Sequence, residues 1–246
     1  MAEPTPLRLF VSPSSCAGNR LVLGADDAAR AWQRGARAGD TIVVLDNSGW
    51  ELTAVVEWAT PVGGEGRVVH RRLAVERRTK VSLYQGLLHP SDFRRLLARA
   101  TELGVVSFTP VIADASLVPP TGDLTGTPDD EAAWASLLRD AAETAGRGRC
   151  PTIGPPMLLD HALDHATRGG LVLLVDPAGD RLASALADRP FSIEVFSPSP
   201  GGFSADERTR AEARGLRLVA PPASRADPIA AGLAVIGAIY GLLEQD

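Results

Sequence analysis

The sequence lacks the residues on which many small binding motifs depend. It has only two cysteines, Cys16 and Cys150, and neither has a second cysteine or a histidine at metal-ligand spacing. Neither a disulfide framework nor a zinc site is therefore indicated. His161 and His165 are four residues apart and could lie on one helix face, but no third ligand is near them in sequence. We expect no bound metal.

Membrane and secretion signals are also missing. No apolar run approaches the ~18 residues of a membrane-spanning helix, and the N-terminus lacks a basic stretch followed by an apolar region. We therefore expect a cytoplasmic protein with no membrane partner. The formal net charge of −5 excludes a uniformly basic coat for nucleic acid, although a local basic patch remains compatible with it.

Several catalytic motifs are absent as well. The chain contains no GxxxxGK[ST], GxSxG or HExxH motif, and no GxGxxG follows a predicted strand. ATPase, serine-hydrolase, zinc-protease and ordinary dinucleotide-binding activities therefore lack the groups that they require.

The first 78 residues predict a small β-rich unit. A β-branched run, a turn signal and a return strand indicate a hairpin, and a short helix that ends at Gly39 is expected before it. These elements are Ala25–Arg37 (helix), Thr41–Asp46, Trp50–Trp58 and Arg67–Glu76 (strands). A basic cluster follows at Arg67, Arg71, Arg72, Arg77, Arg78 and Lys80. Such a cluster is typical of a solvated surface or of contacts with RNA phosphates.

From residue 79 onward, strands alternate with helices, which is typical of a mostly parallel sheet covered on both faces. The expected strands are Val81–Leu87, Ser107–Ile112, Leu171–Asp176, Phe191–Phe196 and Leu216–Val219. The expected helices are Ser91–Leu103, one that begins at Thr127-Pro128, a short one around Leu182–Leu186, one opened by a Ser204/Glu207 capping box, and Ile229–Leu243. Ligands bind beyond the carboxyl ends of such strands, so the loops after the last three strands form the default site.

The last predicted helix, Ile229–Leu243, is apolar almost all round and contains Gly232, Gly237 and Gly241. A helix of this kind must be buried on nearly every side. It is expected to lie between the sheet and a second subunit, with core packing inside one monomer as the alternative.

Four blocks together resemble a known family. They are Val81–Val105 (VSLYQGLLHPSDFRRLLARATELGV), Thr109-Pro110-Val111, Ala141–Pro151 (AAETAGRGRCP) and Pro200–Phe203 before a capped helix. In this order they are similar to the bacterial 16S ribosomal RNA uridine-N3 methyltransferases of the SPOUT superfamily. Arg8–Val11 and Arg37–Asp40 fit the RNA-binding barrel of that family. The resemblance covers essentially the whole chain.

The resemblance implies an α/β fold: a PUA-like RNA-binding β-barrel over residues 1–78, and a SPOUT α/β-knot methyltransferase domain with a C-terminal trefoil knot over residues 79–246. It implies S-adenosylmethionine as cofactor, 16S rRNA in the small ribosomal subunit as substrate, and a homodimer through residues 229–243. Arg225 aligns with the family's arginine and is the candidate catalytic residue. The implied cofactor residues are Asp176, Pro200, Gly201, Gly202, Leu218, Ala220 and Ser224. The implied RNA contacts are Gln85, Glu143, Arg147 and Arg149, and the basic cluster adds Arg71, Arg72 and Lys80 as candidates. For Gln85 and Glu143 the alternative is hydrogen bonding that holds the strand and helix ends together.

Two loops differ from the family pattern. Pro198-Ser199-Pro200-Gly201-Gly202 stands where the family has Gly-Pro-Glu-Gly-Gly, and Ala220–Ile229 (APPASRADPI) replaces a loop in which little beyond an arginine and an acid is matched. These changes leave a second hypothesis open, namely a non-catalytic RNA-binding or ribosome-assembly paralogue that keeps the fold and has lost the methyl-donor site.

Overall fold

The structure is a computed structural model that describes residues 6–114, 128–166, 170–222 and 228–244. Its chain forms two compact units. The barrel unit comprises Met1–Glu76 and Ala142–Cys150, and the α/β unit comprises Arg77–Ala141 and Pro151–Asp246. One short stretch from the middle of the chain, Ala142–Cys150, therefore belongs to the N-terminal unit.

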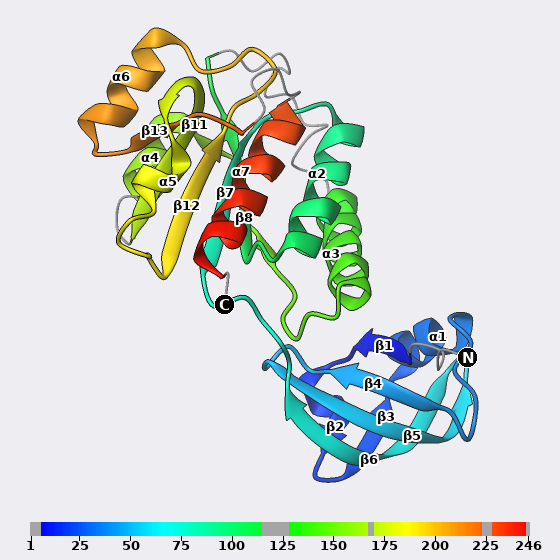
Figure 1. Ribbon diagram of the computed structural model, residues 1–246. Coiled ribbons are helices and arrows are strands. Elements are labelled where there is room, and N and C mark those ends of the chain that lie inside the picture. Colours follow the sequence, from blue (N-terminus) through cyan, green and yellow to red (C-terminus); the bar gives the residue numbers. More distant parts are fainter. Residues whose placement is uncertain (1–5, 115–127, 167–169, 223–227, 245–246) are drawn as a thin grey trace. The chain divides into compact units, whose positions relative to one another are not determined.

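A six-stranded sheet curls into the barrel unit, with strand order β1-β4-β5-β6-β3-β2 (Figure 1). Its strands are β1 (Leu7–Phe10), β2 (Cys16–Ala17), β3 (Arg20–Leu23), β4 (Thr41–Leu45), β5 (Trp50–Thr60) and β6 (Gly63–Leu73), and its helices are the 3-10 turn Pro13–Ser15 and α1 (Ala25–Gln33). β1 pairs in parallel with β4, and the other pairs are antiparallel. The predicted hairpin is confirmed, because β4 and β5 pair across the turn at residues 46–49.

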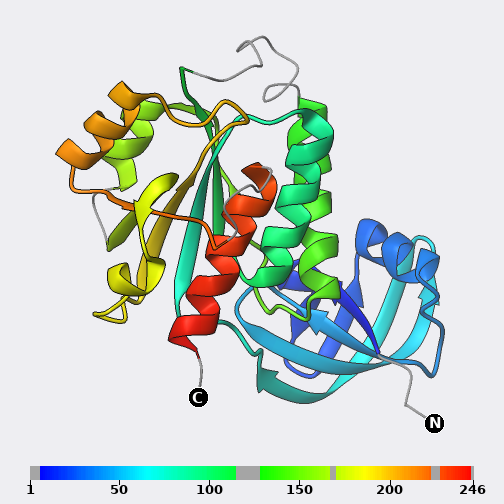
Figure 2. The ribbon, with the colours of Figure 1, turned by 45° about the horizontal axis from the view of Figure 1, so that its top comes forward.

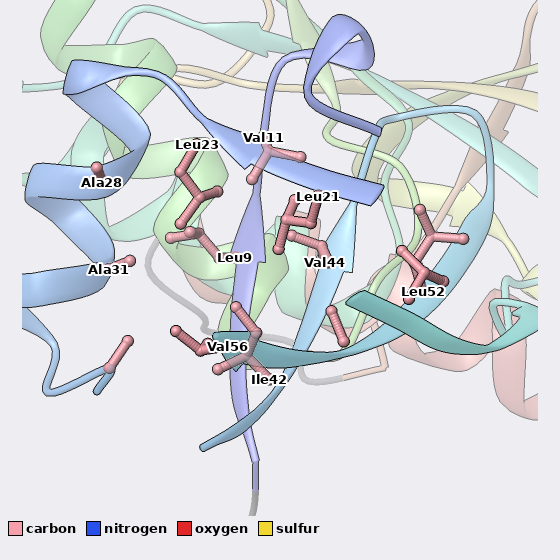
Figure 3. Packing of buried hydrophobic residues seen from close by; sticks show 13 residues of the cluster. Leu9, Val11, Leu21, Leu23, Ala28, Ala31, Ile42, Val44, Leu52 and Val56 are labelled. Carbon is pink, nitrogen blue, oxygen red and sulfur yellow. The ribbon is translucent and has the colours of Figure 1, made fainter. Parts of the chain in front are cut away.

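Alternating side chains of these strands fill the core of the barrel unit. Leu52, Ala54 and Val56 of β5 point inward, where they meet side chains from the other strands and from α1 (Figure 3). Ala28 and Ala31 are the small residues through which α1 packs on this core. Each fully buried Leu, Val or Ile contributes about 1.5–3 kcal/mol, so hydrophobic burial is the main stabilising term of this unit.

Helix α1 ends four residues earlier than the sequence predicts. It stops at Gln33, and Gly35 then adopts a φ of 96°. The amide of Ala36 donates to the carbonyl of Ala31 at 2.9 Å, which closes the C-terminal turn. Gly35 is therefore the residue that ends the helix, because glycine adopts positive φ without a Cβ clash; Gly39 lies in the following turn.

The α/β unit is built on a parallel sheet with strand order β10-β8-β7-β12-β11-β13, and β9 pairs with β8 (Figure 1). The strands are β7 (Lys80–Gly86), β8 (Ser107–Ile112), β9 (Thr152–Ile153), β10 (Met157–Leu158), β11 (Leu171–Asp180), β12 (Ser192–Ser197) and β13 (Arg217–Val219). The helices are α2 (Pro90–Leu103), α3 (Pro128–Thr144), α4 (Leu159–Ala166), α5 (Leu182–Ala185), α6 (Ala205–Ala213) and α7 (Pro228–Leu243). The predicted mostly parallel sheet is confirmed.

Helices cover the two faces of this sheet. α2 and α7 lie side by side on one face, and α4 and α6 lie on the other (Figures 1 and 2). The predicted capping box opens α6: the Ser204 hydroxyl accepts from the Glu207 amide, and the Glu207 carboxylate accepts from the Ser204 amide. Among the described residues, no helix is both long and apolar enough to cross a bilayer.

Candidate cofactor and RNA-binding residues

Three neighbouring strands deliver most of the predicted cofactor residues. In the sheet β11 lies between β12 and β13, and all three run in parallel. The carboxyl ends of parallel strands meet at one edge of a sheet. The chain following β12 at Ser197 and the chain following β13 at Val219 therefore leave the sheet at the same edge, beside the Asp176 segment of β11.

Asp176 ends the buried run of β11 and is itself buried. One carboxylate oxygen accepts from the amide of Ala178 at 2.8 Å, and the other forms an ion pair with Arg208 of α6 at 3.2 Å. Arg208 also donates to the carbonyl of Phe203 at 3.3 Å. Asp176 thus links the end of the buried part of β11 to the first turn of α6. This turn follows directly after the loop that contains Gly201 and Gly202.

The loop Pro198–Gly202 forms a tight turn with open space beside it. The amide of Gly202 donates to the Ser199 carbonyl at 2.9 Å, and Gly202 has a φ of 77°. A Cβ built on Gly202 would meet no heavy atom of the described residues within 4 Å. Glycine is thus required here by backbone conformation, and the turn leaves room for a ligand to approach its main chain.

The third predicted loop begins at Ala220, whose amide donates to the carbonyl of Asp180 at 2.9 Å. The main chain of Gly179 lies so close to Leu218 and Val219 that a Cβ at Gly179 would clash with their backbone atoms. Asp180 pairs with Val219, so strand β11 extends to Asp180, beyond its predicted end at Asp176. Ser224 and the candidate catalytic Arg225 lie outside the described residues.

A cavity of about 540 Å³ adjoins strand β13. Its lining comprises Ala178, Gly179, Asp180, Ser184, Ala185, Glu212, Leu216, Arg217 and Leu218. Its volume lies within the ~300–1,000 Å³ typical of small-molecule sites. Of the predicted cofactor residues, Leu218 lies in this lining.

Gln85 has an unexpected position. It lies at the carboxyl end of the central strand β7 with 1% of its surface exposed. Its side-chain nitrogen Nε2 donates to the carbonyl of Pro198 at 2.9 Å and to that of Gly86 at 3.0 Å. The structure therefore places this predicted RNA contact under the loop Pro198–Gly202.

Arg71, Arg72 and Arg149 are exposed on the barrel unit. Arg72 pairs with Glu51 at 2.6 Å, Arg71 donates to the carbonyl of Gly18, and Arg149 donates to the carbonyl of Ser48 at 2.6 Å. Their contacts leave much of each guanidinium at the surface, as phosphate binding requires. Lys80, in the α/β unit, is half-buried and donates to the Arg77 carbonyl at 2.6 Å.

Glu143 and Arg147 are buried inside the barrel unit. The Glu143 carboxylate accepts from Arg30 at 2.5 Å, from Arg34, and from the amide of Phe10 at 2.6 Å. Arg147 pairs with Glu76 at 3.2 Å. These contacts join Ala142–Cys150 to the barrel. The sequence signal that could have indicated them is the pair Arg30 and Arg34, which are four residues apart at the C-terminal end of α1, with Arg34 as its C-cap residue.

Glu51 and Tyr84 are among the groups with shifted pKa values. Burial alone would raise the pKa of Glu51, but the hydrogen bonds and charges of Arg8 and Arg72 outweigh it and hold that pKa below its ordinary value. Burial, with a smaller contribution from the charge of Glu194, raises the pKa of Tyr84 to about 12. The Tyr84 hydroxyl lies 2.8 Å from His165 Nδ1, so His165 contacts a phenol.

The described residues contain no group of three or more His, Cys, Asp or Glu side chains that could hold a metal ion.

A family model for the RNA methyltransferase domain matches residues 75–220, more than half of the chain. The chain therefore belongs to the RNA methyltransferase domain family. None of the curated protein sequences matches it significantly.

Solved structures share the fold over nearly the whole chain. A ribosomal RNA small subunit methyltransferase E from Neisseria gonorrhoeae, bound to S-adenosyl methionine, is 21% identical, with a TM-score of 0.86 over 97% of this chain and 98% of that one. A putative Legionella pneumophila methyltransferase in complex with the same cofactor is 18% identical, with a TM-score of 0.82 over 97% and 98%. A probable rRNA methyltransferase from Porphyromonas gingivalis is 17% identical, with a TM-score of 0.74 over 96% and 98%. The predicted fold class is confirmed.

Proposed function

We propose that this protein uses S-adenosylmethionine to methylate N3 of a uridine in 16S ribosomal RNA, in the cytoplasm. The observation that carries the proposal is membership of the RNA methyltransferase domain family, together with a fold shared with a small-subunit rRNA methyltransferase over 97% of the chain. The loops at the carboxyl edge of the sheet supply the site.

The loops present fit such a cofactor. The turn at Gly202 leaves open space beside its main chain, and the carboxylate of Asp176 lies buried one strand away. Proline has no N–H, so Pro200 can offer only its carbonyl oxygen and its ring, and the main-chain contacts of the proposal come mainly from Gly201 and Gly202. We assign Asp176, Pro200, Gly201, Gly202, Leu218, Ala220 and Ser224 to the cofactor.

The bound cofactor supplies an electrophilic methyl group. Uridine N3 must lose its proton to solvent water, and the protein must hold that nitrogen in line with the methyl carbon. Good alignment is worth on the order of 7–11 kcal/mol of the barrier. We assign Arg225 to the stabilisation of the uracil anion, since an arginine stays cationic and can hold negative charge on the uracil oxygens.

The exposed arginines of the barrel unit are proposed to bind RNA phosphates. Arg71, Arg72 and Arg149 present guanidinium groups at the surface, and arginine binds phosphate in a bidentate manner. The proposal keeps Lys80 as a further phosphate contact. The burial of Gln85, Glu143 and Arg147 favours indirect roles for these three residues in RNA binding.

The decisive experiment is calorimetric titration with S-adenosylmethionine, followed by methylation of unmodified 16S RNA and of small subunits reconstituted from it. Micromolar binding, about −8 kcal/mol, and the appearance of N3-methyluridine in nucleoside mass spectra are the expected results. The double change Arg71→Glu/Arg72→Glu should weaken RNA binding, whereas the charge-matched double change Arg94→Glu/Arg95→Glu, at exposed positions of α2 in the α/β unit, should not. Absence of cofactor binding by the folded protein would refute the proposal.

We further propose a homodimer through residues 229–243. One face of α7 carries Ala230, Leu233, Ala234, Gly237, Ala238, Gly241 and Leu242, which are all partly or fully exposed. Apolar residues at this helical spacing form an uncovered stripe, which a second copy would bury. Light scattering should give twice the monomer mass for the wild type and the monomer mass for Ala234→Glu; a monomeric wild type contradicts the proposal.

A further inference from the structure

A buried polar junction underlies the loop Pro198–Gly202. Gln85 lies at the end of β7, pairs in register with Ser197 of β12, and is almost completely inaccessible to solvent. Its Nε2 group makes two hydrogen bonds, to the carbonyls of Gly86 and Pro198. The second of these bonds joins residues 113 apart in sequence and fixes the first residue of the loop.

The space around Gln85 is closed by glycines. A Cβ at Gly86 would lie 2.8 Å from the Pro198 carbonyl carbon and closer still to the Ser199 amide nitrogen. A Cβ at Gly232 of α7 would lie 2.6 Å from the Ser197 hydroxyl and 3.6 Å from Gln85 Oε1. Three chain segments therefore converge on this side chain, and the close packing restricts it to one position.

The orientation of the carboxamide follows from its neighbours. Both groups near Nε2 are carbonyl oxygens, which only a donor can satisfy. The other atom, Oε1, is buried and has no hydrogen-bond partner among the residues that the structure describes. A buried acceptor without a partner is unfavourable, and residues kept at such a cost are often found where function requires a fixed geometry.

We propose that Gln85 is a positioning residue for the cofactor loop: its Nε2 group holds the Pro198 carbonyl, and this contact fixes the turn that presents Gly201 and Gly202. The inference rests on the proposed function, which assigns these glycines to the methyl donor. Glutamate could not replace Gln85, because an ionised carboxylate has no donor and would face two carbonyl oxygens. Asparagine is one methylene shorter and would not span the distance.

The test compares Gln85→Met, which keeps the volume and removes both polar atoms, with Tyr84→Phe. Tyr84 precedes Gln85 on β7 and points to the opposite face of the sheet, where its hydroxyl contacts His165. Amide hydrogen exchange is measured at Gly202, whose amide donates to Ser199 within the loop. We expect Gln85→Met to accelerate this exchange at least tenfold and Tyr84→Phe to leave it unchanged.

Cofactor affinity is measured on the same proteins. Gln85→Met should raise the Kd and the KM for S-adenosylmethionine at least tenfold and leave the KM for RNA unchanged. In the wild type, the Gln85 side-chain amide protons should themselves exchange slowly, a readout that needs no variant to fold. Rapid exchange of those protons, or a Gln85→Met protein with unchanged Gly202 exchange, would overturn the inference. A wild type that binds no S-adenosylmethionine refutes the proposed function, while the two exchange measurements still decide the role of Gln85.

Discussion

Each unit contains close internal contacts, and two kinds of contact can be compared. In the barrel unit, the carboxylates of Glu51, Glu76 and Glu143 each pair with one or two arginines, and Glu51 and Glu143 are buried. In the α/β unit, backbones approach one another closely at Gly86 and Gly179. Neither kind of contact is confined to one unit, since the buried Asp176 pairs with Arg208 in the α/β unit, and a Cβ at Gly66 of the barrel unit would lie 2.6 Å from the Val55 carbonyl oxygen. Glu143 is the position where we expect a change of charge to cost most, and Gly86 is a position where we expect a change of side-chain volume to be costly.

The largest effect is expected from Glu143→Ala. This change leaves Arg30, Arg34 and the Phe10 amide without their shared acceptor, and breaking a buried ion pair costs about 3–5 kcal/mol. We expect the free energy of unfolding to fall by about 3 kcal/mol, the lower end of this range, because both arginines are partly exposed. Urea denaturation measures it. Glu57→Ala, which removes an exposed carboxylate 4.0 Å from Arg67, is the control and should change stability little.

In the α/β unit, the corresponding change is Gly86→Ala. The added methyl group would overlap the backbone of Pro198 and Ser199, and overpacking of this kind costs about 1–3 kcal/mol. We expect a lower free energy of unfolding and a higher Kd for S-adenosylmethionine. Gly154→Ala is the matched control, since its nearest neighbour would be 3.8 Å away. Equal effects of the two changes would contradict the steric argument.

The pH dependence of the barrel unit should trace in part to Glu51. Its pKa is lowered in the folded state, so its contribution to stability is complete above the ordinary value of 4.5 and is lost as the pH falls through the folded value. Glu51→Gln should therefore flatten the decline in unfolding free energy between about pH 5 and pH 3. Glu57→Gln should retain the wild-type slope. Identical slopes for both variants would show that Arg8 and Arg72 do not act on Glu51 in solution.

The smallest effect is expected from Tyr84→Phe, which removes one hydroxyl contact and should cost about 1 kcal/mol. The pKa of Tyr84 is raised to about 12, so stability from this group is complete below pH 10.0 and declines as the pH rises through the folded value. Phenolate absorbance should show one tyrosine that ionises near pH 12 in the wild type and not in Tyr84→Phe. If Tyr84 ionised at its ordinary value, it would not be buried as described.

Local signals predicted the elements of the α/β unit well. Strand β8 has the predicted bounds, and helix α2 ends at Gly104, which has a φ of 118°. Glycine and capping residues act within a few positions, so their effect is legible in the sequence. The short strands β1, β2, β3, β9 and β10 and helix α4 were not predicted as elements.

The roles of Glu143 and Gln85 required tertiary information. Both lie in blocks that resemble the family's functional blocks, and on that ground both were predicted to contact RNA. Their partners are Arg30, Arg34 and Pro198, more than 100 residues away in sequence. Hydrophobic patterns indicate which face of an element is buried, but not which distant carbonyl or guanidinium a buried polar group will meet.

The barrel unit is assembled from two stretches of the gene. Ala142–Cys150 supplies the carboxylate shared by Arg30 and Arg34, and it supplies Arg147 to Glu76. A gene fragment that stops at residue 76 encodes a barrel without these groups. Exchange of barrels between relatives must therefore transfer both stretches at once, which ties the ancestry of the barrel unit to that of the RNA methyltransferase domain.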